Sequence, residues 1–518
     1  MFWADSISLE LKDKGPQLVD DAKTPSGKIH VGALRGVIIH DLVYKALKEV
    51  GNKAIFTYII DNFDPMDGLP SYLDQEKYTP EMGKPLKDVP SPDRSSESYA
   101  DYYAHDFIKV LDKLGAKPDI IWMFDIYKKG LMNDYIKLAL DNHEKIQKIY
   151  KDVSGSAKSK DWYPFSPVCD SCGKIGTTKT IGWDGKDITY ICSPHLVEWA
   201  KGCSFEGKKS PFNGGGKMPW KVEWPARMKA LGVTVEGEGK DHASKGGSRD
   251  IANHLITEIF GGTPPYDIPY EHFLYGGKKM SSSKGIGASA EEVSNILPPE
   301  VLRFLMTRTR YSQAIDFDPA QEDTIPKLFD EYDRCSQIFW KKFAGEEELA
   351  RAYELSQISK PQDVFVPRFS LLVNWVQMPN VDELDEASNL KGEKLTDEDK
   401  KAVQERIKYV KIWLEKFAPE EVKFSVLENL PEEAKNLSPK QKELLDKVVQ
   451  LYRGPALTAE DLQNKIYELG QELGLKGSES FQAVYLSLLG KTHGPKAGWL
   501  LHSLDKDLVI KRFKEVNL

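Results

Sequence analysis

The sequence contains few cysteines, no long apolar run and no excess of positive charge. Five cysteines in 518 residues are too few for a disulfide framework. No stretch of about 18 apolar residues occurs, so we expect no transmembrane helix and no membrane partner. The first residues also lack a basic segment followed by an apolar one, so we expect no secretory signal and a cytoplasmic protein.

Charge and composition leave several classes of function open. The net charge of −8 does not by itself indicate a nucleic-acid-binding protein. It does not exclude one, because phosphate contacts need a local basic patch rather than a basic total. A hydrophobic fraction of 40% and a charged fraction of 29% are typical of a globular chain, and the length predicts about three domains.

A strand, a tight turn and a helix are predicted near the start of the chain. Residues 17–19 are strand-like, and apolar residues at helical spacing predict a helix over 30–49. The turn between them, TPSGKIHVG, offers free backbone N–H groups and the positive end of a helix dipole, which bind anions. Gly27 and Gly32 let a ligand lie against the backbone, and His30 adds a side-chain donor. The stretch predicts a phosphate site, although an ordinary tight turn would show the same pattern.

The rest of the first 150 residues alternates between strand and helix patterns. Strands are predicted over 53–60 and 119–123, and helices over 99–114 and 127–150. This alternation predicts an α/β fold, a Rossmann-type doubly wound parallel sheet with its ligand at the carboxyl ends of the strands. Residues 64–98 lack a clear period and are predicted to be an ordered loop insertion.

Four cysteines lie close together in the sequence. Cys169 and Cys172 share one turn, and Cys192 and Cys203 follow. Two thiolate-bearing turns at this separation suit a tetrahedral zinc site, which is structural because four protein ligands leave no open position. His195 is an alternative fourth ligand; we favour Cys203 because the glycine beside it mirrors the glycine after Cys172. The alternative is a set of free thiols in a β-rich insertion.

Two strand signals in the middle of the chain each lead into polar residues. The first, 233–235, runs into Gly239, Asp241 and His242. These positions suit ribose and substrate contacts, although a solvated loop is also possible. The second, 270–275, precedes GGKKMSSSKG, in which glycines flank three hydroxyls and three lysines. A mobile loop of this composition can wrap a polyphosphate.

From residue 289 onward the sequence is almost entirely helical in pattern. The acidic run 381–400 is predicted to be an exposed connection. The chain is accordingly divided into five predicted parts: 1–160, first half of an α/β domain; 161–220, zinc-ribbon-like insertion; 221–288, second half of the α/β domain; 289–343, helical connecting domain; 344–518, a second helical domain.

The turn and the loop together resemble the two signature motifs of class I aminoacyl-tRNA synthetases, HIGH and KMSKS. Residues 30–33 (HVGA) keep the first histidine and the glycine, and Ala33 replaces the last histidine. Residues 279–283 (KMSSS) depart from the second motif only at Ser282. Within the class, the chain most resembles the class I lysyl-tRNA synthetases.

That narrower resemblance covers nearly the whole chain, and it implies that residues 1–160 and 221–288 form the catalytic domain and that residues 344–518 form a helical anticodon-binding domain. It rests on segments such as 223–227 (EWPAR), 239–242 (GKDH) and 408–424, while 474–516 resembles an anticodon-binding end shared with bacterial glutamyl enzymes. Two departures bear on the amino-acid pocket: Met228 stands where a second tryptophan is usual, and Ala22 where glycine is expected.

The resemblance implies that the protein attaches lysine to tRNA(Lys) through a lysyl-adenylate, with ATP and Mg²⁺. It implies His30 and Lys279 as catalytic residues. It implies an ATP site made of Pro25, Gly27, His30, Gly32, Gly239, Asp241, Lys279, Met280, Ser281 and Ser283. A monomer is expected.

For lysine, the resemblance implies Thr24, Trp224, His242 and Tyr270. An ε-ammonium also needs a carboxylate, since burying it unpaired is very costly, and Asp61 and Asp64 are our candidates. For tRNA, the expected residues combine positive charge with an imidazole near the C-terminus: Lys491, His493 and Lys496.

Three alternatives remain at the level of sequence. A glutamyl or glutaminyl enzyme of the same subclass is favoured only by the shared C-terminal end. In a cysteinyl enzyme zinc would bind the substrate thiol, which four closed ligands disfavour. A non-catalytic tRNA- or nucleotide-binding protein predicts damage to His30, Gly32 or Lys279, and all three are present.

Overall fold

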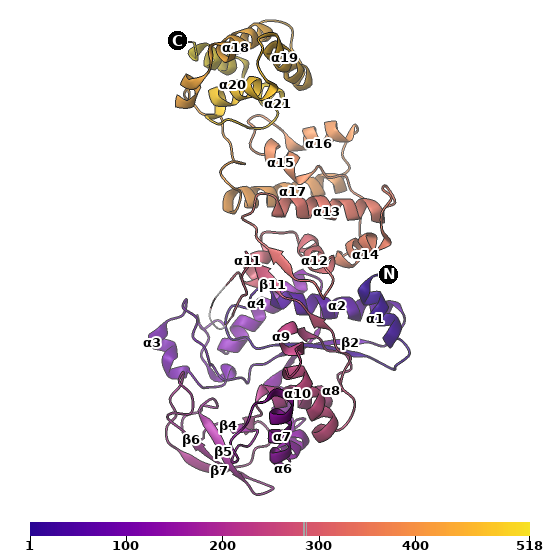
Figure 1. The fold of residues 1–518 in the computed structure, drawn as a ribbon, viewed down its shortest axis with the longest axis vertical. Coiled ribbons are helices and arrows are strands. Elements are labelled where there is room, and N and C mark those ends of the chain that lie inside the picture. The colour runs from indigo at the N-terminus through magenta and orange to yellow at the C-terminus, as the bar shows by residue number, and fades with distance from the viewer. Residues whose placement is uncertain (283–284, 286, 518) are drawn as a thin grey trace. The chain divides into compact units, whose positions relative to one another are not determined.

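The computed structural model describes residues 1–282, 285 and 287–517, which form two compact units (Figure 1). The first unit comprises Met1–Asp318 with Arg334–Pro361, and the second comprises Pro319–Asp333 with Gln362–Leu518. Within the described residues, no helix is long and apolar enough to cross a membrane.

A parallel sheet lies at the centre of the first unit. Its strands are β1 (Leu18–Lys23), β2 (Ile55–Ile60) and β3 (Asp119–Trp122). They pair in the order β1-β2-β3, and on the other side of β1 parallel bridges join Val19 to Val235 and Val235 to Tyr266. Later segments of the chain therefore lie on both sides of β1 in the sheet. The carboxyl end of β1 is thus a topological switch point, which is the usual ligand position in such sheets.

The remaining strands of this unit are short. They are β4 (Ser166–Pro167), β5 (Thr178–Trp183), β6 (Ile188–Cys192), β7 (Glu206–Lys209), β8 (Gly216–Lys217), β9 (Glu238–Gly239), β10 (Pro269–Tyr270), β11 (Phe273–Tyr275) and β12 (Ile315–Phe317). The strands β5, β6 and β7 form an antiparallel sheet in the cysteine-bearing insertion. This insertion shares one apolar core with the central sheet, since Phe165 and Ile188 pack in the same buried cluster as Ile59 of β2.

The first unit also contains helices, of which α2 packs directly on β1 and β2 of the central sheet. They are α1 (Trp3–Leu11), α2 (Ala33–Glu49), α3 (Gln75–Tyr78), α4 (Tyr99–Lys113), α5 (Met123–Lys128), α6 (Asn133–Asp141), α7 (His143–Ser154), α8 (Trp220–Leu231), α9 (Lys240–Ala243), α10 (Ser248–Leu255), α11 (Ala290–Ser294), α12 (Pro299–Thr307) and α14 (Glu347–Ser356). The helix α2 follows the predicted phosphate turn and buries Leu34, Val37 and Ile38 completely.

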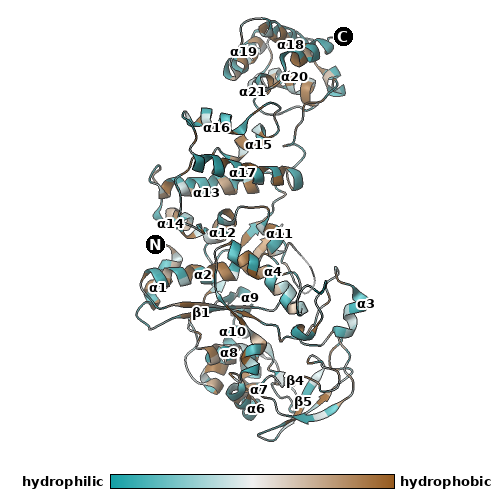
Figure 2. Ribbon diagram, turned by 180° about the vertical axis from the view of Figure 1, so that it is seen from behind, coloured by the Kyte–Doolittle hydropathy of each residue, from teal (hydrophilic) through white to brown (hydrophobic). Residues whose placement is uncertain are grey.

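The second unit is built from helices. They are α15 (Phe369–Trp375), α16 (Glu383–Lys391), α17 (Asp397–Lys416), α18 (Pro439–Tyr452), α19 (Ala459–Glu472), α20 (Gly477–Leu489), α21 (Ala497–Ser503) and α22 (Lys506–Glu515), while α13 (Thr324–Phe339) belongs to both units. Figure 2 shows α17 as mostly hydrophilic, and its buried residues, such as Val403, Val410 and Trp413, form one stripe. The predicted α/β fold with a parallel sheet and a helical C-terminal half is confirmed.

Several local predictions are wrong. Residues 127–150 are not one helix, because Gly130, with φ +78°, follows α5 and two further helices come after it. The run 381–400 is not a mere connection: the Asp382 side chain accepts hydrogen bonds from two backbone N–H groups and begins α16, which ends at Gly392 in the left-handed conformation. Residues 64–98, by contrast, form an ordered loop insertion as expected: they contain the short helix α3 and share a small apolar core with Tyr99, Ala100 and Tyr103 of α4.

Candidate active site

The predicted phosphate turn (residues 24–32) lies beside the loop with the sequence GGKKMSSSKG (residues 276–285), which we call the lysine-serine loop. The two segments meet although His30 and Ser282 are 252 residues apart. The His30 backbone N–H donates to Ser282 Oγ at 3.2 Å, and the Val31 N–H donates to the Ala288 carbonyl at 3.0 Å. His30 also forms an antiparallel bridge with Ser289. These backbone contacts bring the two segments to the carboxyl end of β1.

A cleft of about 160 Å³ opens between the two segments. Its lining combines an ammonium, an imidazole and hydroxyl groups, from Lys28, His30, Tyr72, Ser281 and Ser289, with one carboxylate, that of Glu292. Donors of these kinds suit an anionic ligand such as a polyphosphate.

His30 presents a neutral imidazole to this cleft. Burial, and secondarily the positive charge of Lys23, lower the pKa of His30 to about 3. Its buried Nδ1 makes no hydrogen bond to any described residue. Because the ring is neutral at pH 7, it can donate one hydrogen bond to a phosphoryl oxygen without a prior protonation step.

The glycines of the turn are required by the neighbouring loop. Gly27 has φ +154°, and a Cβ there would lie 2.7 Å from the Ser282 carbonyl oxygen and 2.7 Å from the Tyr72 hydroxyl. A Cβ at Gly32 would lie 3.1 Å from Met280 Cε, so Met280 packs over the first turn of α2. Pro25 is buried at the start of the same turn. The glycines therefore let the loop approach the turn closely.

Lys279 and Asp241 contact each other outside the cleft lining described above. Lys279 Nζ lies 3.1 Å from Asp241 Oδ2, and His272 Nε2 lies 3.2 Å from the same oxygen. The hydrogen bond from Lys279 is the main reason that the pKa of Asp241 lies below its usual value. Ser283 lies outside the described residues.

Neither the backbone conformation nor the packing at position 239 requires a glycine there. Its φ is −59°, which any residue can adopt, and a Cβ there would meet no atom of the described residues within 4 Å. It lies at the end of β9, four residues beyond Val235, which bridges in parallel to Val19 of β1. An open backbone edge at this position leaves room for a ligand.

Asp61 and Asp64 surround the ammonium group of Lys217, a fully buried side chain on β8 that sequence reasoning missed. Lys217 Nζ lies 2.6 Å from Asp61 Oδ2 and 2.9 Å from Glu223 Oε2, and it also contacts Asp64. The Thr24 hydroxyl donates to Asp64 at 2.6 Å. Burial alone would lower the pKa of Lys217, but the three carboxylates outweigh it and raise that pKa well above its usual value.

The other predicted lysine-binding residues lie on two different surfaces. Trp224 and His242 both pack against Trp220, with ring centroids 6.2 and 5.3 Å apart. The Tyr270 hydroxyl instead lies against α2, 2.7 Å from where a Cβ on Gly36 would be. These contacts place Trp224 and His242 together beside Trp220, and Tyr270 beside α2.

Comparison with known proteins identifies the family. Residues 1–359 match the family described as tRNA synthetases class I (K). The chain belongs to this family. Residues 369–517 of the synthetase match a second family, described as an anticodon binding domain.

Curated relatives of the synthetase match it from end to end. A protein named lysine--tRNA ligase from Methanosarcina barkeri is 38% identical over 99% of this chain and 97% of its own length. Proteins of the same name from Thermoplasma volcanium and Methanocaldococcus jannaschii are 34% and 35% identical, over 100% and 99% of this chain and 99% of their own lengths. The predicted family is thus confirmed.

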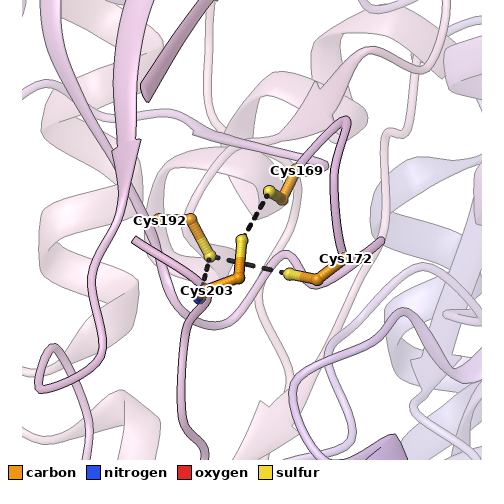
Figure 3. Close-up of side chains that lie close together, drawn as sticks. All are labelled: Cys169, Cys172, Cys192 and Cys203. Carbon is orange, nitrogen blue, oxygen red and sulfur yellow. Dashed lines mark hydrogen bonds between the residues drawn. The ribbon is translucent and has the colours of Figure 1, made fainter. Parts of the chain in front are cut away.

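The four clustered cysteines of the synthetase converge in space (Figure 3). All four sulfurs lie within 4.8 Å of one another, with Cys169–Cys203 at 3.6 Å and Cys172–Cys192 at 3.7 Å. A Zn–S bond of about 2.3 Å in a tetrahedron places sulfurs roughly 3.8 Å apart, so the donor set fits zinc. His195 is exposed and, among the described residues, is not part of the group.

The predicted tRNA-binding residues make contacts with other residues of the second unit. Lys491 Nζ donates to the Lys423 carbonyl at 2.5 Å and to that of Glu420, and His493 Nε2 lies 3.1 Å from the Glu421 carbonyl. Lys496 lies over the ring of Trp499, 4.6 Å from its centroid. These contacts hold the loop after α20 against residues 420–423.

Proposed function

We propose that this protein activates L-lysine with ATP and transfers it to tRNA(Lys). The observation that supports this most strongly is the shared cleft of the phosphate turn and the lysine-serine loop. Both segments contribute groups that suit phosphates, and the cleft lies at the switch point of a parallel sheet. The relatives that match this chain over nearly their whole length carry the name lysine--tRNA ligase.

In the first step, the lysine carboxylate attacks the α-phosphorus of ATP and pyrophosphate leaves. The protein positions the reactants and stabilises the negative charge on the phosphoryl oxygens. The neutral His30 ring donates to the α-phosphate. Lys279 leaves its ion pair with Asp241 and pairs with the departing pyrophosphate. Ser281 donates a further hydrogen bond to the pyrophosphate, and we assign the same role to Ser283.

Mg²⁺ enters this scheme together with ATP. Magnesium in such sites is bound mainly by substrate phosphates, water and one or two carboxylates. Among the described residues that line the cleft, Glu292 supplies the carboxylate, and its side chain also accepts a hydrogen bond from the Ser289 N–H. A bound magnesium ion would neutralise part of the negative charge of the phosphates.

In the second step, a terminal ribose hydroxyl of tRNA attacks the adenylate. The second unit would receive the anticodon, where aromatic and charged side chains can read unstacked bases. Lys496 with Trp499 offers both kinds of group. Aminoacylation of a tRNA with a lysine anticodon tests this assignment: we expect lysine to be attached, and attachment of glutamate in its place would contradict it.

A substitution at Gly239 tests whether ATP lies beside this residue. We expect Gly239→Val to raise the KM for ATP about tenfold or more, because a branched side chain would occupy the open edge where the nucleotide lies. Stability should change little, since a Cβ at this position meets no atom of the described residues within 4 Å. Steady-state kinetics and a melting curve measure both quantities; an unchanged KM would remove Gly239 from the ATP site.

We further propose that the four cysteines bind one structural zinc ion. Their thiolates would hold it, and the ion would link the turn after β4 to the end of β6. We expect about one zinc per chain by metal analysis, and we expect Cys172→Ser to lose it and to cost at least about 2 kcal/mol of stability. Cys335→Ser, a change at a buried cysteine outside the cluster, should keep the zinc. Full zinc retention by Cys172→Ser would contradict the site.

A further inference from the structure

Lys23 is the last residue of β1 and directly precedes the phosphate turn. It pairs with Ile60 in the register of β1 and β2, and its carbonyl accepts a hydrogen bond from the Asp61 N–H at 2.9 Å. These contacts fix the backbone of Lys23 at the carboxyl end of two neighbouring parallel strands. This is the edge at which such sheets bind their ligands.

The Lys23 side chain extends on the side of the sheet that α2 covers. Side chains alternate along a strand, so Lys23 faces the same side as Asp21. Asp21 lies against α2, because its Oδ2 is 3.7 Å from His40 Nδ1 and 2.9 Å from where a Cβ on Gly36 would be. Lys23 is about 7 Å farther along the strand, toward the end of the sheet at which α2 begins.

The Lys23 ammonium has no partner of its own. It makes no ion pair or hydrogen bond with any residue that the structure describes, although its side chain is half-buried. Burial lowers the pKa of Lys23, and the Asp21 carboxylate opposes this effect only in part. Lys28 and Lys279, by contrast, each have a carboxylate partner, at 3.8 and 3.1 Å. A half-buried cation without a partner is costly, so an anionic ligand beside Lys23 would be stabilising.

His30 and the first turn of α2 meet near this ammonium. A Cβ on Gly32 would lie 3.0 Å from His30 Nδ1, so the ring lies over the start of the helix. After burial, the positive charge of Lys23 is the second cause that lowers the pKa of His30, which places the ammonium near the ring. Gly32 has no side chain to cap the helix, and residues 33–36 include no acid. An ammonium, an imidazole and the positive end of a helix dipole together suit an anion.

The α-phosphate of ATP is the anion that the proposed reaction brings to this place. In that reaction Lys279 pairs with the departing pyrophosphate, whereas the α-phosphate receives a donor only from the neutral His30. The lysine carboxylate must also approach the α-phosphate, and two anions repel each other more strongly in a half-buried site than in water. A fixed ammonium beside the α-phosphate reduces this repulsion and stabilises the charge on its oxygens.

We propose that the Lys23 ammonium binds the α-phosphate of ATP together with His30 and is a further catalytic residue of the first step. This inference rests on the proposed function. As a carboxylate oxygen of lysine forms its bond to the α-phosphorus, the bond from the α-phosphorus to the bridging oxygen breaks, and pyrophosphate leaves with the electron pair. Lys23 keeps its protons throughout and donates hydrogen bonds to the non-bridging oxygens of the α-phosphate.

Inhibition of lysine-dependent ATP–pyrophosphate exchange by AMP and by adenosine tests this assignment, because adenosine lacks the α-phosphate. We expect Lys23→Met to raise the inhibition constant of AMP about tenfold or more, since a charge-assisted contact is lost, and to change that of adenosine less than twofold. The same variant should lower kcat about 100-fold. Lys23→Arg keeps the positive charge and should retain most of the preference for AMP. A merely structural role of Lys23 would change both inhibition constants together.

Lys53→Met is the matched control. Lys53 is an exposed lysine two residues before β2, at the opposite, amino end of the same sheet. This variant should change neither inhibition constant more than twofold. Lys23→Met should keep its melting temperature, because it removes a charge that has no partner among the described residues; if it does not fold, Lys23→Gln takes its place.

Two results separate the inference from the proposed function. An unchanged ratio of the two inhibition constants in Lys23→Met would overturn the inference, while lysine-dependent exchange by the wild type left the proposed function intact. Absence of lysine-dependent exchange by the wild type would overturn the function itself.

Discussion

Replacing His30 by alanine should lower the rate of lysine-dependent ATP–pyrophosphate exchange by about 10²- to 10³-fold. Loss of one preorganised donor to a developing oxyanion costs roughly 3–4 kcal/mol of transition-state stabilisation. His30 is placed for this role because its ring borders the cleft, is neutral and has a buried nitrogen without a hydrogen-bond partner among the described residues. The variant should still fold, since the backbone N–H of residue 30, not the side chain, holds Ser282.

His254→Ala is the control for this variant. His254 is an exposed residue of α10 that pairs with Glu258 one turn away, and it is not among the residues that line the cleft. Its removal should change the exchange rate less than twofold. A loss below about fivefold in His30→Ala, with the fold intact, would mean that the turn binds a ligand without taking part in the phosphoryl chemistry.

Replacing Lys217 by methionine should be among the most destabilising changes in the chain. The variant would leave Asp61, Asp64 and Glu223 together in a buried site without their cation. Removing one partner of a buried ionic cluster costs about 3–5 kcal/mol. Denaturant unfolding measures the loss. Lys179→Met, which breaks the more exposed pair with Asp161, should cost less than about 1 kcal/mol.

The pH dependence of Lys217→Met distinguishes lost charge from lost packing. Burial raises the pKa of Asp64, and it raises the pKa of Glu223 to about 8. A carboxyl group whose pKa is higher in the folded state stabilises the fold when protonated, and this contribution is lost as the pH rises through the folded pKa. The variant should therefore recover stability as the pH falls from 8 toward 5. A loss that is constant over this range would indicate packing alone.

The sequence predicts the parts of this fold that repeat a local pattern. The helices α2 and α4 and the strands β1 to β3 follow from apolar periodicity, and the cysteine group follows from spacing. The helix α16 was missed because its acidic residues resemble a solvated linker, whereas Asp382 begins it by accepting two backbone N–H bonds. Such a capping interaction depends on geometry as well as residue type.

The buried charges of the candidate site were harder to predict. Lys217 follows three glycines and resembles a surface linker in sequence, yet it is 3% exposed because it is surrounded by the nearby Glu223 and by Asp61 and Asp64 from a distant segment. Asp20 and Asp21 did give a local signal, since acids rarely occur inside an apolar strand. Glu236 and Glu238 gave the same signal on either side of Gly237. Their partners are fixed by tertiary contacts, which one sequence does not reveal.

The most direct test of the account is ATP–pyrophosphate exchange by the wild-type protein, measured with each of the twenty amino acids in turn. The account predicts exchange that depends on lysine and is far weaker with glutamate, glutamine and cysteine. Exchange with glutamate but not lysine would contradict it, and the absence of exchange with every amino acid would indicate a binding protein in place of an enzyme.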